Sequence, residues 1–293
     1  MSALASPCPL AQRSDRWRGG IFRGLLLSCI VISAAMLVTL LLDVTLDGAG
    51  SLSFDFLTNS SSFKPELAGI WPALTGTLWL MAIVTLFVVP VGVAAAVHLE
   101  EYADPARWWN RVVEVNIQNL AAVPSIVYGI LGLAFIVRGP LSLGPVVLAG
   151  ALTLGLLVLP VVIIAAREAI RAVPPSIREG SLALGATQWQ TIYKQVLPAA
   201  IPGIATGVIL ALSRAIGETA PLIVIGAASF VAFAPSSPDD VFTAVPIQMF
   251  EWISRPQEEF HQLAAAGILV LMAVLLAMNS VAIWLRNKYE RKW

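Results

Sequence analysis

Charged residues are scarce in this chain, and their scarcity excludes the commonest class of protein. Only 12% of its 293 residues are charged, whereas 58% are hydrophobic, and the mean hydropathy is +0.82. A soluble globular domain carries about a quarter charged residues and rarely exposes large apolar patches. The formal net charge is zero, so no overall field favours a nucleic acid. The composition therefore predicts a membrane protein that contacts lipid and binds no nucleic acid.

Cysteine and the common catalytic motifs are also nearly absent. Cys8 lies in a polar tail and Cys29 in the first apolar run, with no metal-ligand spacing, so neither a metal nor another cofactor is expected. An intramembrane hydrolase would need a Gly-x-Ser-x-Gly or His-Glu-x-x-His motif, and the sequence has neither. It also lacks the Gly-x-x-x-x-Gly-Lys-Ser/Thr run of a nucleotide-binding loop. We therefore expect a transport subunit, not an enzyme, with any ATP hydrolysis on a partner; a passive channel is the alternative.

Long apolar runs are what the sequence has in abundance. A bilayer core of about 30 Å requires about 20 apolar residues in a helix. Six segments reach that length, which predicts an all-α polytopic bundle with six spanning helices. The first is too long for a signal-peptide core and lacks a cleavage site after it, so we expect it to be retained. The predicted spans are residues 21–42, 71–97, 117–137, 145–166, 199–227 and 263–285.

The basic residues predict the orientation of these spans. With the N-terminus placed inside, fourteen Lys and Arg residues fall on inner segments and only three, Lys64, Arg138 and Arg255, on outer segments. Such a bias is typical of cytoplasmic loops. Both termini are therefore predicted to be cytoplasmic. On the outer side, residues 246–252 are expected to form a short interfacial helix with Trp252 at the membrane surface.

The inner loop at residues 174–198 carries the most specific local pattern. Pro174 and the proline after it stop the preceding helix, and Ser176 with Glu179 has the form of a capping box, which predicts a helix from Ile177. Gly185 is expected to end that helix in a left-handed conformation. The loop thus begins with a short, well-delimited helix.

A second short helix follows in the same loop. Thr187 and Gln190 repeat the capping pattern. Apolar residues at helical spacing then predict one stripe, and a helix–glycine–helix segment with an apolar face is suited to docking in a groove of another protein. We call residues 174–198 the elbow. The predicted stripe consists of Trp189, Ile192, Tyr193, Val196 and Leu197.

The elbow resembles the EAA loop of ABC importer permeases. The likeness lies in Glu179-Gly180-Ser181, Gly185 six residues after the glutamate, and Leu197-Pro198, while Gln195 departs from the usual isoleucine. In that family the loop fits a cleft on a cytoplasmic ATPase and transmits its closure. An ordinary interhelical loop is the alternative. The ATPase-coupling residues that the resemblance implies are Glu179, Gly185, Trp189, Ile192, Leu197 and Pro198.

Further stretches resemble the phosphate, or PstA-type, branch of these permeases. They are residues 69–78 with 90–102, 119–129 and 213–222. The resemblance implies a type I ABC importer permease fold in a bacterial cell membrane. The implied partners are a second, homologous permease, two ATPase subunits and an external phosphate-binding protein. A permease for another oxyanion, such as sulfate or molybdate, is the alternative.

The implied division of the chain is a tail (1–20), a first helix with an outer loop (21–65), a permease domain (66–286) and a tail (287–293).

Arg214 and Glu218 form the candidate substrate pathway. Arg214 is expected near the middle of the fifth span, where an arginine costs about 2.5–3.5 kcal/mol to insert. Glu218 lies four residues later, so the two side chains can pair on one helix face. A guanidinium presents forked donors that match phosphate oxygens. We expect Arg214 to attract a passing phosphate and Glu218 to hold the arginine in place; a structural ion pair is the alternative.

Overall fold

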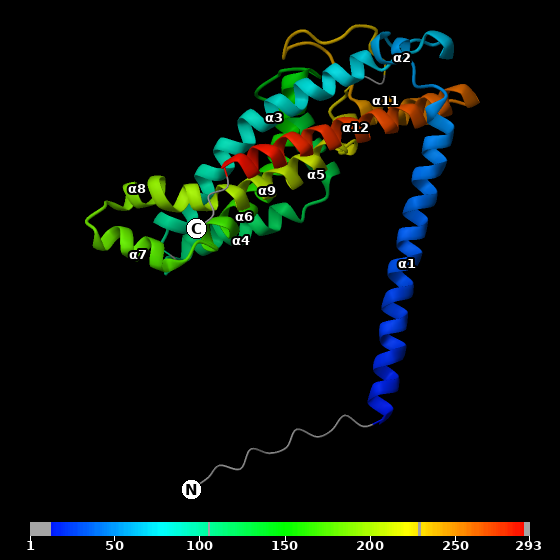
Figure 1. Ribbon diagram of the computed structural model, residues 1–293. Helices are drawn as coiled ribbons and strands as arrows, with labels where there is room; N and C mark the ends of the chain where they lie inside the picture. Colours follow the sequence, from blue (N-terminus) through cyan, green and yellow to red (C-terminus); the bar gives the residue numbers. More distant parts are fainter. Residues whose placement is uncertain (1–12, 105, 228–229, 290–293) are drawn as a thin grey trace.

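The computed structural model describes residues 13–104, 106–227 and 230–289, and this part of the chain is almost entirely helical (Figure 1). Cys8, Arg291, Lys292 and the boundary at Ala228 lie outside the described residues. The elements are α1 (Arg13–Ala49), α2 (Phe54–Thr58), η1 (Pro65–Leu67), α3 (Trp71–Val97), η2 (His98–Tyr102), α4 (Trp108–Ala121), α5 (Ser125–Leu131), η3 (Gly132–Val137), α6 (Val147–Arg171), α7 (Pro175–Ala183), α8 (Gln188–Thr191), η4 (Ile192–Val196), α9 (Leu197–Ile216), α10 (Ala220–Val224), α11 (Val245–Ile253) and α12 (Glu258–Tyr289).

Within the described residues, five helical segments are each long and apolar enough to cross a membrane, and a bent pair is the sixth candidate. The prediction of a continuous third span at 117–137 is wrong. Helix α4 ends at Ala121, and α5 with η3 leaves it at an angle of 105°. Pro124 has no backbone N–H and disfavours helical geometry at Val123, so the helix breaks immediately before it. The hydroxyl of Tyr128 donates to the carbonyl of Leu120 at 2.9 Å and ties the two halves together.

The predicted fifth span, 199–227, is also shorter than expected. Helix α9 ends at Ile216, and Pro221 lies in the first turn of the separate short helix α10. Proline cannot donate to the carbonyl four residues back, here that of Gly217, and glycine itself favours helix ends. Arg214 therefore lies in the last turn of α9, not near the middle of a continuous span, and Glu218 lies beyond the helix end.

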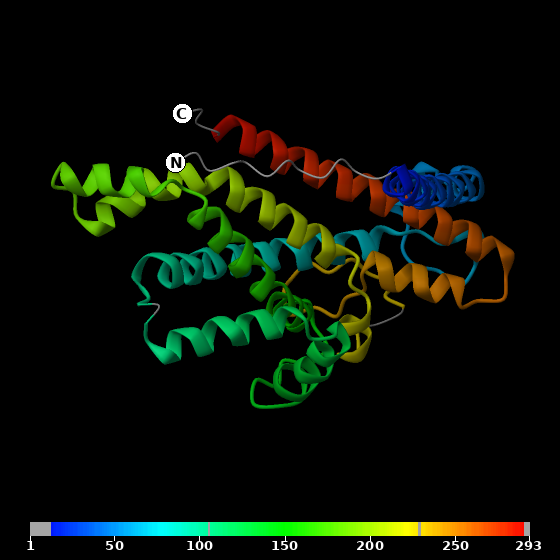
Figure 2. The same cartoon turned by 90° about the horizontal axis from the view of Figure 1, so that it is seen from below.

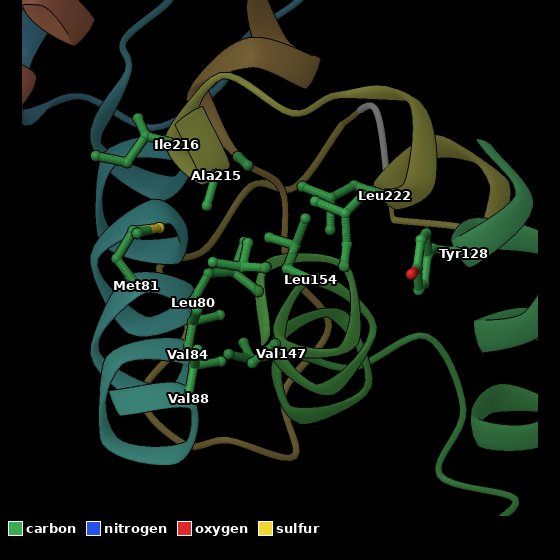
Figure 3. Close-up of a cluster of buried hydrophobic side chains, with 14 of the residues drawn as sticks. Leu80, Met81, Val84, Val88, Tyr128, Val147, Leu154, Ala215, Ile216 and Leu222 are labelled. Carbon is green, nitrogen blue, oxygen red and sulfur yellow. The ribbon is translucent and has the colours of Figure 1, made fainter. Parts of the chain in front are cut away.

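The core forms where α3, α9 and the C-terminal segments pack around α6, the most deeply buried span. Most of its side chains are aliphatic, and they interdigitate between the helices (Figure 3). The labelled members are Leu80, Met81, Val84 and Val88 on α3, Tyr128 on α5, Val147 and Leu154 on α6, Ala215 and Ile216 on α9, and Leu222 on α10.

Helix α9 approaches α6 very closely along one seam. A Cβ atom added at Gly203 would lie 2.7 Å from Cβ of Ala169, and one at Gly207 would lie 2.4 Å from Cβ of Ala165. Small residues four apart on both helices are a common means of close packing in membranes, where apolar burial alone does not drive helices together. This seam fixes α9 relative to the rest of the bundle.

Helix α1 lies outside this packed core. It extends away from the bundle and contacts mainly α12, and the view of Figure 2 shows it end-on beside that helix. The apolar side chains along its length, such as Met36 and Leu40, are exposed. A span with this surface needs lipid or another subunit to cover it.

At the end of the bundle opposite the elbow, α11 is the short helix predicted at 246–252. Trp252 is only 1% exposed and packs against Phe56, with ring centroids 5.9 Å apart. The prediction that this tryptophan lies at the membrane surface is therefore wrong; α11 buries it beneath α2. In the loop before α11, N–H and O–H groups of Ser236 and Ser237 donate to Asp240 and lower the pKa of its carboxyl.

We predict that Gly207→Leu destabilises the permease by about 1–3 kcal/mol, because the larger side chain overfills the seam against Ala165. The measurement is thermal unfolding in detergent together with the amount of folded protein in membranes. Gly24→Leu, on the exposed helix α1 where no atom lies within 4 Å of an added Cβ, is the matched control. Both changes improve helix propensity. Equal stability of the two variants would contradict the proposed seam.

Candidate functional site

The elbow has the helix–glycine–helix structure that the sequence predicts, with one difference at its start. Helix α7 begins at Pro175 with Pro174 as N-cap, and no side chain caps it. The predicted capping box of Ser176 and Glu179 is therefore wrong. Proline is favourable in the first helical position because its φ is already helical and its missing N–H would have no partner there. The helix consequently starts two residues earlier than Ser176 would have specified.

The end of α7 and the start of α8 follow the prediction closely. Gly185 has φ +84°, its N–H donates to Leu182 O at 2.9 Å, and the N–H of Ala186 donates to Ser181 O at 3.2 Å. These two bonds form a Schellman motif, which requires the left-handed conformation that glycine adopts easily. Thr187 and Gln190 exchange side-chain-to-backbone bonds of 3.3 and 3.0 Å, so the second capping box is confirmed.

The predicted apolar stripe is divided between two environments. Ile192 and Val196 are buried, at 1% and 0% exposure, and Val196 packs against α6 and the base of α9. Trp189 and Tyr193 are each 61% exposed, and their rings stack with centroids 6.0 Å apart. Residues four apart share a helix face, so these two pairs occupy neighbouring faces. Ile192, expected on the docking surface, instead anchors the elbow to its own chain.

The exposed tip of the elbow is unusually apolar. Leu184, which the sequence reasoning did not single out, is 90% exposed, and Leu182 is 50% exposed. Glu179 is exposed on α7, while Leu197 and Pro198 are half-buried where α9 begins. A surface hollow of about 470 Å³ separates α7 from the following helix and is lined by Ile177, Gly180, Ser181, Leu184, Gln190 and Gln195, among others. Large exposed apolar side chains on one short segment make that segment a candidate interaction site.

Two ion-pair groups connect the elbow end of the bundle, and the sequence reasoning did not predict either. In the first, Arg167 pairs with Glu100 at 2.8 Å and with Glu114 at 2.7 Å, and Arg171 pairs with Glu100 at 3.0 Å. In the second, Arg178 on α7 pairs with Glu101 at 2.8 Å. The signal in the sequence was the consecutive acidic pair Glu100-Glu101, which follows the apolar run at 71–97.

Arg214 and Glu218 form the predicted ion pair. Nε of Arg214 donates to Oε1 of Glu218 at 3.2 Å, with side-chain exposures of 59% and 16%. Within the described residues, the terminal guanidinium nitrogens donate to no protein acceptor. The neighbouring Ser213 donates to Asn279 on α12 at 2.7 Å and fixes the rotation of α9. The guanidinium is therefore held at one edge and available at the other, at a break between α9 and α10.

Comparison with known proteins places this geometry in a family. Residues 88–293 match the family described as "Binding-protein-dependent transport system inner membrane component". The chain is 33% identical over 291 residues to the "Probable ABC transporter permease protein YqgI" of Bacillus subtilis, covering 95% of this chain and 97% of that protein. It is 34% identical over 228 residues to the "Phosphate transport system permease protein PstA 1" of Mycobacterium tuberculosis, covering 76% and 72%.

A solved structure agrees with the sequence relatives. The crystal structure of a bacterial alginate ABC transporter, in complex with an alginate pentasaccharide-bound periplasmic protein, matches with a TM-score of 0.68 at 17% identity, covering 93% of this chain and 96% of that chain. Likeness at this identity shows the fold, which is that of a type I ABC importer permease. ATP hydrolysis in such importers belongs to separate ATPase subunits. The chain is therefore a member of the binding-protein-dependent transport permease family, a PstA-related multi-pass subunit of the bacterial inner membrane that serves an ABC importer and is not itself an enzyme.

Proposed function

We propose that this permease imports inorganic phosphate, which passes Arg214 and Glu218 while the elbow transmits the closure of partner ATPases. The observation that carries the proposal is a guanidinium that has terminal donors to spare at a helix break within the fifth span. Irregular backbone at membrane depth is tolerated where it is buried in protein or lines a water-filled cavity, and broken helices mark substrate sites in many transporters. The break between α9 and α10 therefore supports a pathway beside Arg214.

The chemistry of the pair suits an anion that must bind briefly and then leave. Arginine stays charged at any physiological pH and offers a planar fork of donors that fits two phosphate oxygens. Glu218 occupies Nε and neutralises part of the charge. Without that carboxylate the site would hold an anion more tightly, because the full positive charge would face it. The pair of Arg214 and Glu218 thus favours brief binding and release of the anion over tight binding.

The elbow supplies the proposed coupling to ATP. Trp189, Tyr193 and Leu184 form an exposed apolar tip that fits a groove on a cytoplasmic ATPase. Glu179 is exposed on α7 and Gly185 ends that helix, while Leu197 and Pro198 connect the elbow to α9. In this proposal the elbow is the EAA loop and both termini are cytoplasmic.

The remaining assembly follows from the same proposal. A second, homologous permease completes the pathway as a heterodimer, two ATPase subunits bind the elbows, and an external phosphate-binding protein delivers the anion. The permease domain at 66–286 provides the pathway. The first helix and its loop at 21–65 lie against α12 and leave apolar surface for lipid or the second permease.

We predict that Arg214→Gln lowers phosphate uptake by at least about tenfold, because a hydrogen bond to a charged group contributes about 1.5–3 kcal/mol. Initial uptake of labelled phosphate is measured in cells that have no other phosphate importer, with the amount of permease in the membrane determined in parallel. Arg138→Gln, at another exposed arginine next to a helix end, is the matched control. Normal uptake by Arg214→Gln would end the proposal for this residue. If sulfate or molybdate suppressed the uptake of labelled phosphate by the wild type as strongly as unlabelled phosphate does, that anion would replace phosphate as the proposed substrate.

We predict that substitutions on the two faces of the elbow affect different properties, ATPase binding on the exposed face and stability on the buried one. Trp189→Ala combined with Tyr193→Ala should weaken ATPase binding by roughly tenfold or more, as exposed aromatic anchors do, with little change in thermal stability. Ile192→Ala should destabilise the permease by about 2–5 kcal/mol through a buried cavity. Co-purification with the ATPase and thermal unfolding separate the two effects. Leu86→Ala, on the exposed surface of α3, controls for loss of apolar surface. Full ATPase binding by the double variant would exclude this tip as the docking surface.

A further inference from the structure

We propose that Glu101 is a positioning residue that ties both elbow helices to the end of α3 and thereby converts elbow movement into movement of the bundle; this rests on the proposed coupling function of the elbow. Arg178 on α7 and Gln188 on α8 both bond to Glu101. We call these three residues the Glu101 clamp.

The clamp consists of short bonds, and its ion pair between Glu101 and Arg178 has little exposure to water. Nε and Nη2 of Arg178 donate to Oε1 of Glu101 at 3.0 and 2.8 Å, and Nε2 of Gln188 donates to the Glu101 carbonyl at 2.6 Å. The side chains of Glu101 and Arg178 are 10% and 22% exposed. Charge-assisted bonds in a partly dehydrated position are stronger and better aligned than exposed ion pairs.

The same arginine also closes the end of α6. Its Nη1 donates to Val173 O at 2.6 Å, and its Nη2 donates to Ile170 O at 2.8 Å. Cationic side chains commonly satisfy the last carbonyls of a helix in this way. Arg178 therefore joins three separate elements, α7, the C-terminus of α6 and the η2 turn that continues α3.

These contacts matter because α7 has few other attachments to the bundle. It packs chiefly on α8 and η4, which belong to the elbow itself, and Ile177 is its apolar contact with the buried cluster between α3 and α6. Among the described residues, Glu101 is the acidic partner of Arg178, with no second carboxylate to replace it. The neighbouring Glu100, by contrast, has two arginine partners. The clamp is thus the charged link from α7 to the end of α3, beside the apolar contact of Ile177 and the chain connection to α6.

A positioning role for the clamp and a merely stabilising role predict changes in different measured quantities. A structural pair would change the amount of assembled transporter and would lower transport and ATP hydrolysis together. A positioning pair should change how much phosphate moves for each ATP hydrolysed. The two roles are therefore distinguishable in the complete transporter.

The test uses the assembled transporter, with ATPase and phosphate-binding protein, reconstituted in proteoliposomes. Phosphate import and ATP hydrolysis are measured together for Glu101→Gln, Arg178→Gln and the double variant. We expect each to retain ATPase binding but to lower phosphate moved per ATP by at least about fivefold, the lower end of typical coupling between distant sites. Because the residues act as a pair, the double variant should be no worse than either single variant.

Asp104→Asn, in the exposed pair with Arg107, is the matched control and should leave the ratio unchanged. A normal ratio in Glu101→Gln, or additive losses in the double variant, would overturn the clamp. Hydrogen exchange of residues 175–183 in the same complex gives a second readout that needs no substrate. It should be faster in Glu101→Gln, and unchanged exchange would also overturn the clamp. A wild-type complex with no phosphate-dependent ATPase activity would contradict the proposed function while the exchange result still decides the clamp.

Discussion

The seam between α6 and α9 is the contact on which the rest of this molecule depends. Gly203 and Gly207 face Ala169 and Ala165 so closely that no larger side chain fits. Lipid tails are as apolar as a helix surface, so close van der Waals packing has to provide the association that water provides in soluble proteins. The rotation and depth of α9 follow from this seam, and with them the positions of the elbow and Arg214.

One continuous helical segment joins the two functional regions. Residues 188–216 run from the stacked pair of Trp189 and Tyr193, through the π-helical turn η4, to Arg214 in the last turn of α9. Movement of the elbow would therefore be transmitted along this one helical segment to the ion pair of Arg214 and Glu218. The Glu101 clamp adds a second connection, because it links α7 to α3 and α6. The two routes together relate an apolar docking tip to a charged site at the far end of α9.

The membrane also constrains where this fold can break. Unpaired backbone groups are costly in hydrocarbon, so the breaks at 122–124 and 217–219 need protein or water around them. The first is bridged by the hydroxyl of Tyr128. The second lies beside the exposed guanidinium of Arg214. An open surface at such a break, together with the uncovered apolar length of α1, fits a chain whose structure is completed by other subunits.

The sequence alone determined the features that depend on neighbours along the chain. Apolar run length located the spans, although not the breaks in the third and the fifth. Gly185 determined the left-handed end of α7, and Thr187 with Gln190 determined the capping box, because these two structures need only a few adjacent residues. Only the tertiary structure decided that Ile192 turns inward while Trp189 stays exposed, and that α9 stops just after Arg214. It also decided which charges meet: Arg178 and Glu101 are 77 residues apart, and no local pattern specifies a partner at that distance.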